Sequence, residues 1–122
     1  MKNNNLPKYI PKNIKNSIED FVEIVNNLLG NRIKQIYLYG SYARGDFRED
    51  SDIDIMILTD LSDEEILESR DKIYELAYDI EEKYDFEIYL SPLIKNIDKF
   101  NYWSEALPFY TNVQKEGITL NE

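Results

Sequence analysis

The 122-residue sequence contains no cysteine and no histidine. The absence of cysteine excludes disulfide bonds and thiolate metal sites. The absence of histidine excludes imidazole zinc sites, Ser-His-Asp triads and histidine acid–base catalysis. Any chemistry of this chain therefore depends on carboxylates, hydroxyls, lysines, arginines and backbone groups.

Long hydrophobic runs are also absent. The longest apolar stretches are far shorter than the roughly 20 residues that span a bilayer, and residues 1–5 lack the hydrophobic segment of a signal peptide. We therefore expect a cytoplasmic protein that does not bind membranes. The length and the 43% of hydrophobic residues fit a single domain over residues 11–122. Residues 1–10 are polar and read as a flexible N-terminal arm.

Basic residues are scarce in one part of the chain. Residues 60–90 hold 12 acidic and 3 basic side chains and supply most of the net charge of −10. This charge would repel a phosphate backbone, so duplex nucleic acid is not an expected partner. It would attract a basic protein, although the same acids are also typical of the solvated face of one helix.

Hydrophobic spacing and turn residues predict a domain of the α/β (α+β) class, with a small mixed β-sheet flanked by helices. The expected helices are 12–29, closed by Gly30, 63–83, opened by a capping box at Ser62, and two short ones at 96–106 and 108–116. The expected strands are 33–39, 53–58 and 86–90, the last stopped by Pro92.

An aromatic cluster falls in the two short C-terminal helices. It either covers the open face of the sheet or docks a partner. Its members are Phe100, Tyr102, Trp103, Leu107, Phe109 and Tyr110.

The stretch from Gly40 to Asp54 carries the most chemical information. A Gly40-Ser41 turn between a strand and a short helix offers backbone N–H groups and a hydroxyl to a phosphate. Asp52 and Asp54 are two residues apart at the head of a strand, so both carboxylates leave the same face. Such a pair suits Mg²⁺ with a nucleoside triphosphate, although Asp-x-Asp also occurs in turns and caps. Arg44 either contacts the phosphates or holds the loop by an ion pair.

The sequence GSYARGDFREDSDIDIMI resembles the signature of the DNA polymerase β-like nucleotidyltransferase superfamily. The ARG after the serine, the SDIDI segment and the tail LPFYTNVQKEGITL resemble the minimal nucleotidyltransferases (MNT), which act as antitoxins beside HEPN-domain ribonuclease toxins. The resemblance covers residues 37–120 and implies the polymerase β-like nucleotidyltransferase fold.

The resemblance also implies roles for individual residues. Gly40 and Ser41 would bind the triphosphate of ATP, and Asp52 and Asp54 would be catalytic and bind two Mg²⁺ ions. A third-strand acid would complete the metal site and serve as a base, and here it would be Glu87, with Asp85 as a competitor on the same face.

The implied reaction is transfer of AMP from ATP to a hydroxyl, expected on a tyrosine of a cognate HEPN toxin, with which the chain would form a hetero-oligomer. Two alternatives remain open. The acceptor could be a small molecule, as in antibiotic-modifying relatives, or the chain could be a catalytically weak or inactive antitoxin that neutralises by binding.

Overall fold

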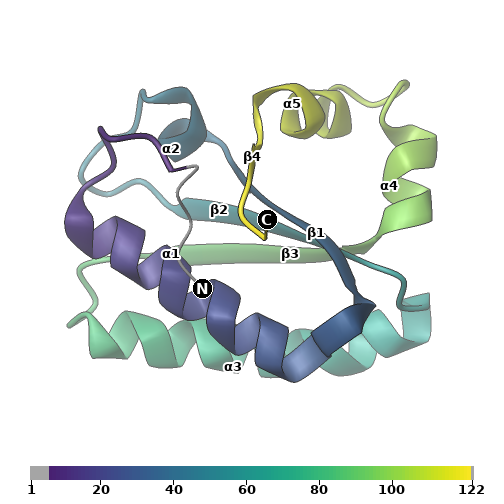
Figure 1. Ribbon diagram of the computed structural model, residues 1–122, viewed down its shortest axis with the longest axis horizontal. Helices are drawn as coiled ribbons and strands as arrows, with labels where there is room; N and C mark the ends of the chain where they lie inside the picture. The colour runs from purple at the N-terminus through teal and green to yellow at the C-terminus, as the bar shows by residue number, and fades with distance from the viewer. Residues whose placement is uncertain (1–5, 122) are drawn as a thin grey trace.

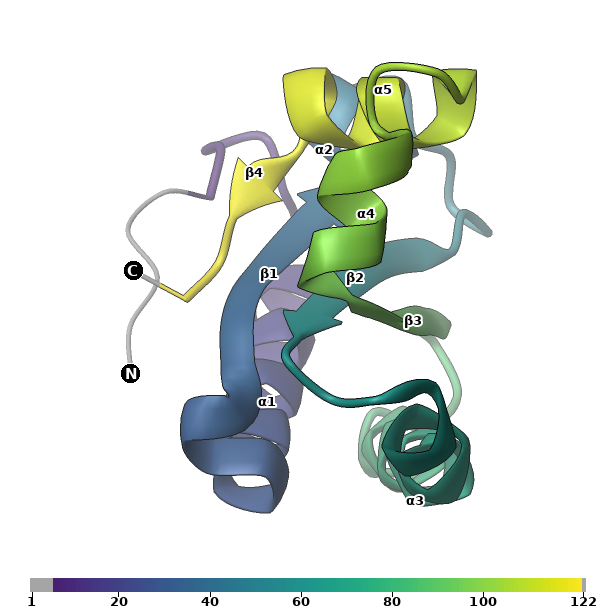
Figure 2. The same ribbon diagram turned by 90° about the vertical axis from the view of Figure 1, so that its right-hand side faces the viewer.

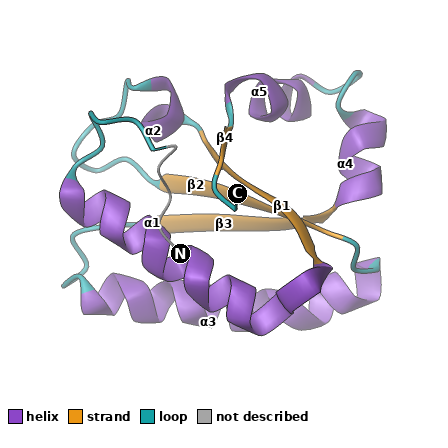
Figure 3. Cartoon of the chain, in the orientation of Figure 1, coloured by secondary structure: helices purple, strands orange, loops and turns teal. Residues whose placement is uncertain are grey.

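The computed structural model describes residues 6–121 as a four-stranded sheet with helices on both faces (Figures 1 and 3). A 3-10 turn over Gly30–Arg32 separates the first helix from the first strand. The elements are α1 (Lys12–Leu29), β1 (Ile33–Tyr39), α2 (Ser41–Arg44), β2 (Ile53–Thr59), α3 (Asp63–Lys83), β3 (Leu90–Asn96), α4 (Ile97–Trp103), α5 (Pro108–Glu116) and β4 (Ile118–Thr119).

The strands follow the order β3-β2-β1-β4. β1 is antiparallel to β2 and β4, whereas β2 and β3 are parallel. The sheet is therefore mixed, as predicted, and the α/β class with flanking helices is confirmed. The fourth strand was not predicted, because a two-residue strand has no periodicity to detect.

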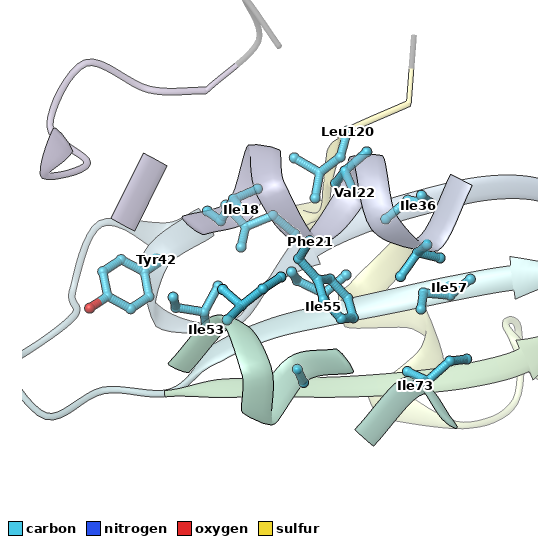
Figure 4. Packing of buried hydrophobic residues seen from close by; sticks show 14 of the residues in the cluster. Ile18, Phe21, Val22, Ile36, Tyr42, Ile53, Ile55, Ile57, Ile73 and Leu120 are labelled. Carbon is cyan, nitrogen blue, oxygen red and sulfur yellow. The ribbon is translucent and has the colours of Figure 1, made fainter. Parts of the chain in front are cut away.

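The two faces of the sheet are covered unequally. α1 and α3 lie together on one face (Figure 2), where odd-numbered residues of β2 such as Ile55 pack against Phe21 and Ile73 (Figure 4). α4 and α5 lie on the other face, over a small cluster that includes Met56 and Phe100. No helix within residues 6–121 has both the length and the hydropathy to cross a membrane.

The first two long helices and strands match the sequence prediction closely. α1 ends at Gly30, and α3 begins with the expected capping box, in which the Ser62 hydroxyl accepts from the Glu65 N–H and the Glu65 side chain accepts from the Ser62 N–H. The two short helices are also confirmed.

The prediction of a third strand over 86–90 is wrong. After α3, Asp85 and Phe86 adopt positive φ angles, and the strand begins only at Leu90 and continues through Pro92. Tyr89 O accepts the Ile53 N–H of β2 at 2.7 Å, whereas the Leu90 N–H donates away from the sheet, to Glu81 at 2.8 Å. Backbone N–H groups alternate in direction along a strand, so the nitrogen of Pro92, two residues after Leu90, also points away from the sheet. Its missing N–H therefore removes no bond from the sheet, as is usual for proline on an edge strand.

Residues 6–10 also differ from the expected loose arm. Leu6 and Ile10 are buried in the main core. The Tyr9 hydroxyl lies 2.8 Å from the carbonyl oxygens of both Tyr42 and Ala43. This segment therefore packs beside α2, while residues 1–5 of the expected arm lie outside the described residues.

Candidate active site

The two halves of the Gly40–Asp54 motif meet at one end of the two central strands, β1 and β2. β1 ends where β2 begins, because the two strands are antiparallel, and Tyr39 lies opposite Asp54. Asp54 belongs to the same face of β2 as Met56 and Leu58, which is the face covered by α4 and α5. The pairing thus brings the Gly-Ser turn against the carboxylate of Asp54.

Gly40 cannot be replaced by a larger residue without a rearrangement. Its φ of 76° lies in the left-handed region, where side chains are strained. A Cβ on Gly40 would also overlap the Oδ2 atom of Asp54. The glycine therefore allows the carboxylate of one strand to lie against the backbone of the other.

Ser41 begins the short helix α2, which ends at Gly45. The ring of Tyr42 is buried and stacks on Phe47 with 4.5 Å between ring centroids, which anchors the turn. The N–H groups of the first turn have no acceptor within the helix, as in every helix. Together with the Ser41 hydroxyl they are available to an anionic group in front of the turn.

The two aspartates differ in their surroundings. Asp52 is exposed, whereas Asp54 is partly buried. Burial of Asp54, and then the negative charge of Asp52, raise its pKa to about 6, although Arg44 acts in the opposite direction. Two neighbouring carboxylates match the donor set that Mg²⁺ takes from proteins when phosphates and water supply the remaining oxygens. Asp52 and Asp54 therefore fit the divalent cation that the sequence motif implies.

These residues line an open cleft of about 590 Å³ between this end of the sheet and α5. Its walls are formed by Tyr39, Gly40, Ser41, Arg44, Ser51, Asp52, Asp54, Phe109, Asn112, Val113 and Glu116. Burial, and then the charge of Asp54, raise the pKa of Tyr39 above its usual range, so its phenol stays neutral. Sequence reasoning missed Asn112 and Glu116 as lining residues. Their spacing with Phe109 and Val113 along one side of a helix is the signal that could have revealed them.

Arg44 lies in the cleft and is also ion-paired. Its Nε donates to Asp46 Oδ2 at 3.2 Å, and its Nη1 lies 3.6 Å from Glu116 Oε2. These pairs are about half exposed and so contribute little stability. Arg44 thus has the loop ion pair considered from the sequence and still faces the space in front of Ser41.

Glu87 is not brought together with the two aspartates. It lies in the turn before β3, exposed, in a separate hollow of about 650 Å³ lined also by Phe86 and Tyr89. The β3 residue opposite Asp54 is Ser91. Within residues 6–121 no group of three or more acidic side chains could hold a metal ion. The expectation of Glu87 on the third strand is therefore wrong, and Asp85, in the turn after α3, does not replace it.

Residues 18–115 match the family model described as "Nucleotidyltransferase domain". This chain belongs to the nucleotidyltransferase family. It is 33% identical over 111 residues to a protein of Methanocaldococcus jannaschii that is provisionally named protein adenylyltransferase MJ0604, with 88% of this chain and 98% of the relative covered. The chain is thus a nucleotidyltransferase enzyme by family, and its cleft is lined by Gly40, Ser41, Asp52 and Asp54.

Solved structures resemble this chain to different degrees. A nucleotidyltransferase, provisionally so assigned, from Sulfolobus solfataricus superposes with a TM-score of 0.51 at 16% identity, covering 93% of this chain and 90% of that one. A crystal structure of a toxin-antitoxin with AMP-PNP has a TM-score of 0.49 at 20% identity, covering 83% and 70%. The first of these supports the nucleotidyltransferase fold.

Proposed function

We propose that this nucleotidyltransferase transfers AMP from ATP to a hydroxyl group of a second protein, a tyrosine of a HEPN-domain ribonuclease toxin, and thereby neutralises it in the cytoplasm. The observation that carries the proposal is the convergence of the Gly40-Ser41 turn with Asp52 and Asp54 in one open cleft. The sequence resemblance to minimal nucleotidyltransferase antitoxins supplies the identity of the partner.

ATP would bind with its phosphates against the Ser41 turn and with Arg44 beside them. Asp52 and Asp54 would hold one or two Mg²⁺ ions, which neutralise phosphate charge and lower the pKa of the attacking hydroxyl. Phe109 is exposed on the α5 wall and meets Tyr39 edge to face, with 5.8 Å between ring centroids. Its ring offers the adenine an apolar surface on the wall of the cleft.

In the reaction, the acceptor oxygen attacks the α-phosphorus of ATP. The bond from that phosphorus to the bridging oxygen breaks, and pyrophosphate leaves. The hydroxyl proton passes to solvent water in the open cleft, because Asp52 and Asp54 are assigned to holding Mg²⁺ and are not free to act as the base. With Glu87 outside the cleft, no third acid is assigned to this step.

A macromolecular acceptor fits the cleft better than a small one. The space is open, and its lining residues come from the adjoining ends of β1 and β2, from α2 and from α5. A small acceptor needs a pocket that encloses it, whereas a second protein brings its own surface. The relative from M. jannaschii carries the name of a protein adenylyltransferase, which supports the same choice.

The test is intact-mass spectrometry of a purified HEPN-domain ribonuclease, to be sought in the neighbouring reading frames, after incubation with this chain, ATP and MgCl₂. We expect mass increases in steps of one AMP on a tyrosine. The step should disappear with EDTA and with the double variant Asp52→Asn, Asp54→Asn.

A matched control removes two carboxylates elsewhere. Glu19→Gln with Glu23→Gln changes α1, outside the cleft, and should transfer AMP like the unmodified chain. If the toxin is inhibited but never gains mass, the chain acts as an antitoxin that neutralises by binding and not by AMP transfer. AMP transfer to aminoglycosides in the absence of any protein acceptor would favour the small-molecule alternative.

A further inference from the structure

Helix α3 exposes a row of large apolar side chains to solvent. The exposed fractions are 63% for Leu67, 46% for Tyr74 and 56% for Tyr78. Their spacing of seven and four residues places them along one side of the helix, next to but separate from the buried row that contains Ile73. Exposed apolar side chains that repeat along one side of a helix are typical of an interaction site, and here Arg70 and Asp71 separate Leu67 from Tyr74.

The row continues beyond α3 at both ends. Phe86, which is also exposed, lies 5.5 Å from Tyr78 between ring centroids. At the other end Leu67 shares a groove of about 400 Å³ with Trp103 of α4. We call Leu67, Tyr74, Tyr78 and Phe86 the α3 strip.

The α3 strip ends next to the active site loop. Phe86 lines one hollow together with Glu49 and Asp50, which directly precede the segment that carries Asp52. A protein lying on the strip would therefore reach the loop beside the catalytic cleft.

Acidic residues border the strip. α3 contains nine acidic and three basic side chains, and the exposed Asp71, Asp79 and Glu82 lie beside Tyr74 and Tyr78. The groove at Leu67 is different, since Arg70 and Lys95 line it and Lys99 there pairs with Asp63. The excess of acid thus lies at the Tyr78–Phe86 end, nearest the cleft.

This charge decides which occupant fits. A second copy of the chain, with a net charge of −10, would be repelled. The neighbouring sheet edge also discourages pairing with another strand, because the Pro92 nitrogen faces outward and has no hydrogen to donate. A protein with a basic rim around an apolar centre would be attracted and would bury the strip.

We propose that the α3 strip is the docking surface for a basic protein, and, on the basis of the proposed function, that this protein is the ribonuclease toxin. A ribonuclease needs a basic surface to hold the phosphate backbone of RNA. Occupying that surface with the acidic end of the strip would compete with RNA. Docking and AMP transfer would then be separate contributions of one chain to neutralisation.

The experiment measures the affinity of the HEPN-domain protein for this chain by isothermal titration calorimetry, in buffer without ATP. Leu67→Ser with Tyr78→Ser should raise the Kd at least about 30-fold, the range for two central apolar contacts. Asp79→Asn with Glu82→Gln should weaken binding at 50 mM salt and flatten its salt dependence. Leu28→Ser on α1, where the side chain is 39% exposed, is the matched control and should bind normally. Circular dichroism confirms that each variant is folded.

Unchanged affinity of the folded Leu67/Tyr78 variant would overturn the proposal. So would the absence of binding by the unmodified chain, or a dimer of this chain alone that the same variant dissociates in sedimentation. AMP transfer is measured separately in the same samples. If AMP transfer persists and the Kd does not change when the α3 strip is altered, the docking surface is refuted and the proposed function still holds. Binding through the strip without transfer would do the reverse.

Discussion

The two faces of the sheet differ in how many buried residues they hold, and therefore in what they contribute to stability and to the active site. The face under α1 and α3 holds 21 buried residues of the main core, whereas the face under α4 and α5 holds five. The glycine turn and both aspartates open onto the second face. Since burial of apolar area is the main source of stability, the first face stabilises the fold, and the lightly covered second face can leave a cleft open.

The largest expected effect tests this division directly. Phe21→Ala removes a fully buried ring from the main core and should lower the free energy of unfolding by about 3–5 kcal/mol. Phe109→Ala removes an exposed ring from the cleft wall and should cost less than about 1 kcal/mol. Urea denaturation measures both. Equal losses would mean that the two faces share the stability.

A smaller effect on stability, but a large one on activity, is expected at Gly40. Gly40→Ala combines a strained φ with an overlap on Asp54, and should cost about 1–3 kcal/mol and reduce AMP transfer at least about 100-fold. Gly30→Ala is the control, since Gly30 has a similar φ of 56° but nothing within 4 Å of its Cβ position. Gly30→Ala should cost about 1 kcal/mol and leave transfer unchanged. Identical behaviour of the two variants would show that φ, and not the contact with Asp54, matters.

The ionised carboxylate of Asp54 is expected to destabilise the folded chain at neutral pH. Its pKa is about 6 in the folded chain and 3.8 in the unfolded one, so the folded chain holds the proton more tightly. Stability should therefore fall as pH rises from about 4 to 6 and stay lower above that. Asp54→Asn should be more stable than the unmodified chain by about 1–2 kcal/mol at pH 8, after discounting for solvent screening, and equally stable near pH 3.5. Urea denaturation at the two pH values tests this, and a variant that is less stable at pH 8 would contradict it.

Local sequence patterns were sufficient wherever neighbours along the chain decide the structure. The helix stripe of α1, the capping box at Ser62 and the β-branched runs of β1 and β2 are local, as is the Gly40–Asp54 motif. The position of β3 depends instead on tertiary structure. Pro92 fits within this edge strand only because its nitrogen points away from β2. The residue beside Asp54 is likewise set by the register between distant strands, which places Ser91 there.

The residues that line the cleft and those of the α3 strip could not be predicted from local sequence patterns, for a related reason. Amphipathic spacing shows that a helix has a polar side but not what that side faces. Asn112 faces the cleft only because α5 packs across the end of β1. Tyr78 is mostly exposed, because Ile73, Ala77 and Ile80 already fill the side of α3 that meets the sheet.

The smallest expected effect concerns the acid that the family resemblance placed in the site. Glu87→Gln should transfer AMP within about twofold of the unmodified chain, because Glu87 is exposed in a separate hollow. Asp52→Asn, the same loss of one charge inside the cleft, should reduce transfer at least about 100-fold. Initial rates of pyrophosphate release at saturating ATP and Mg²⁺ compare them. A large loss with Glu87→Gln would mean that the turn at Asp85 and Phe86 rearranges when ATP binds and carries a third carboxylate to the lightly covered face, so that the cleft described here is an open form of the site.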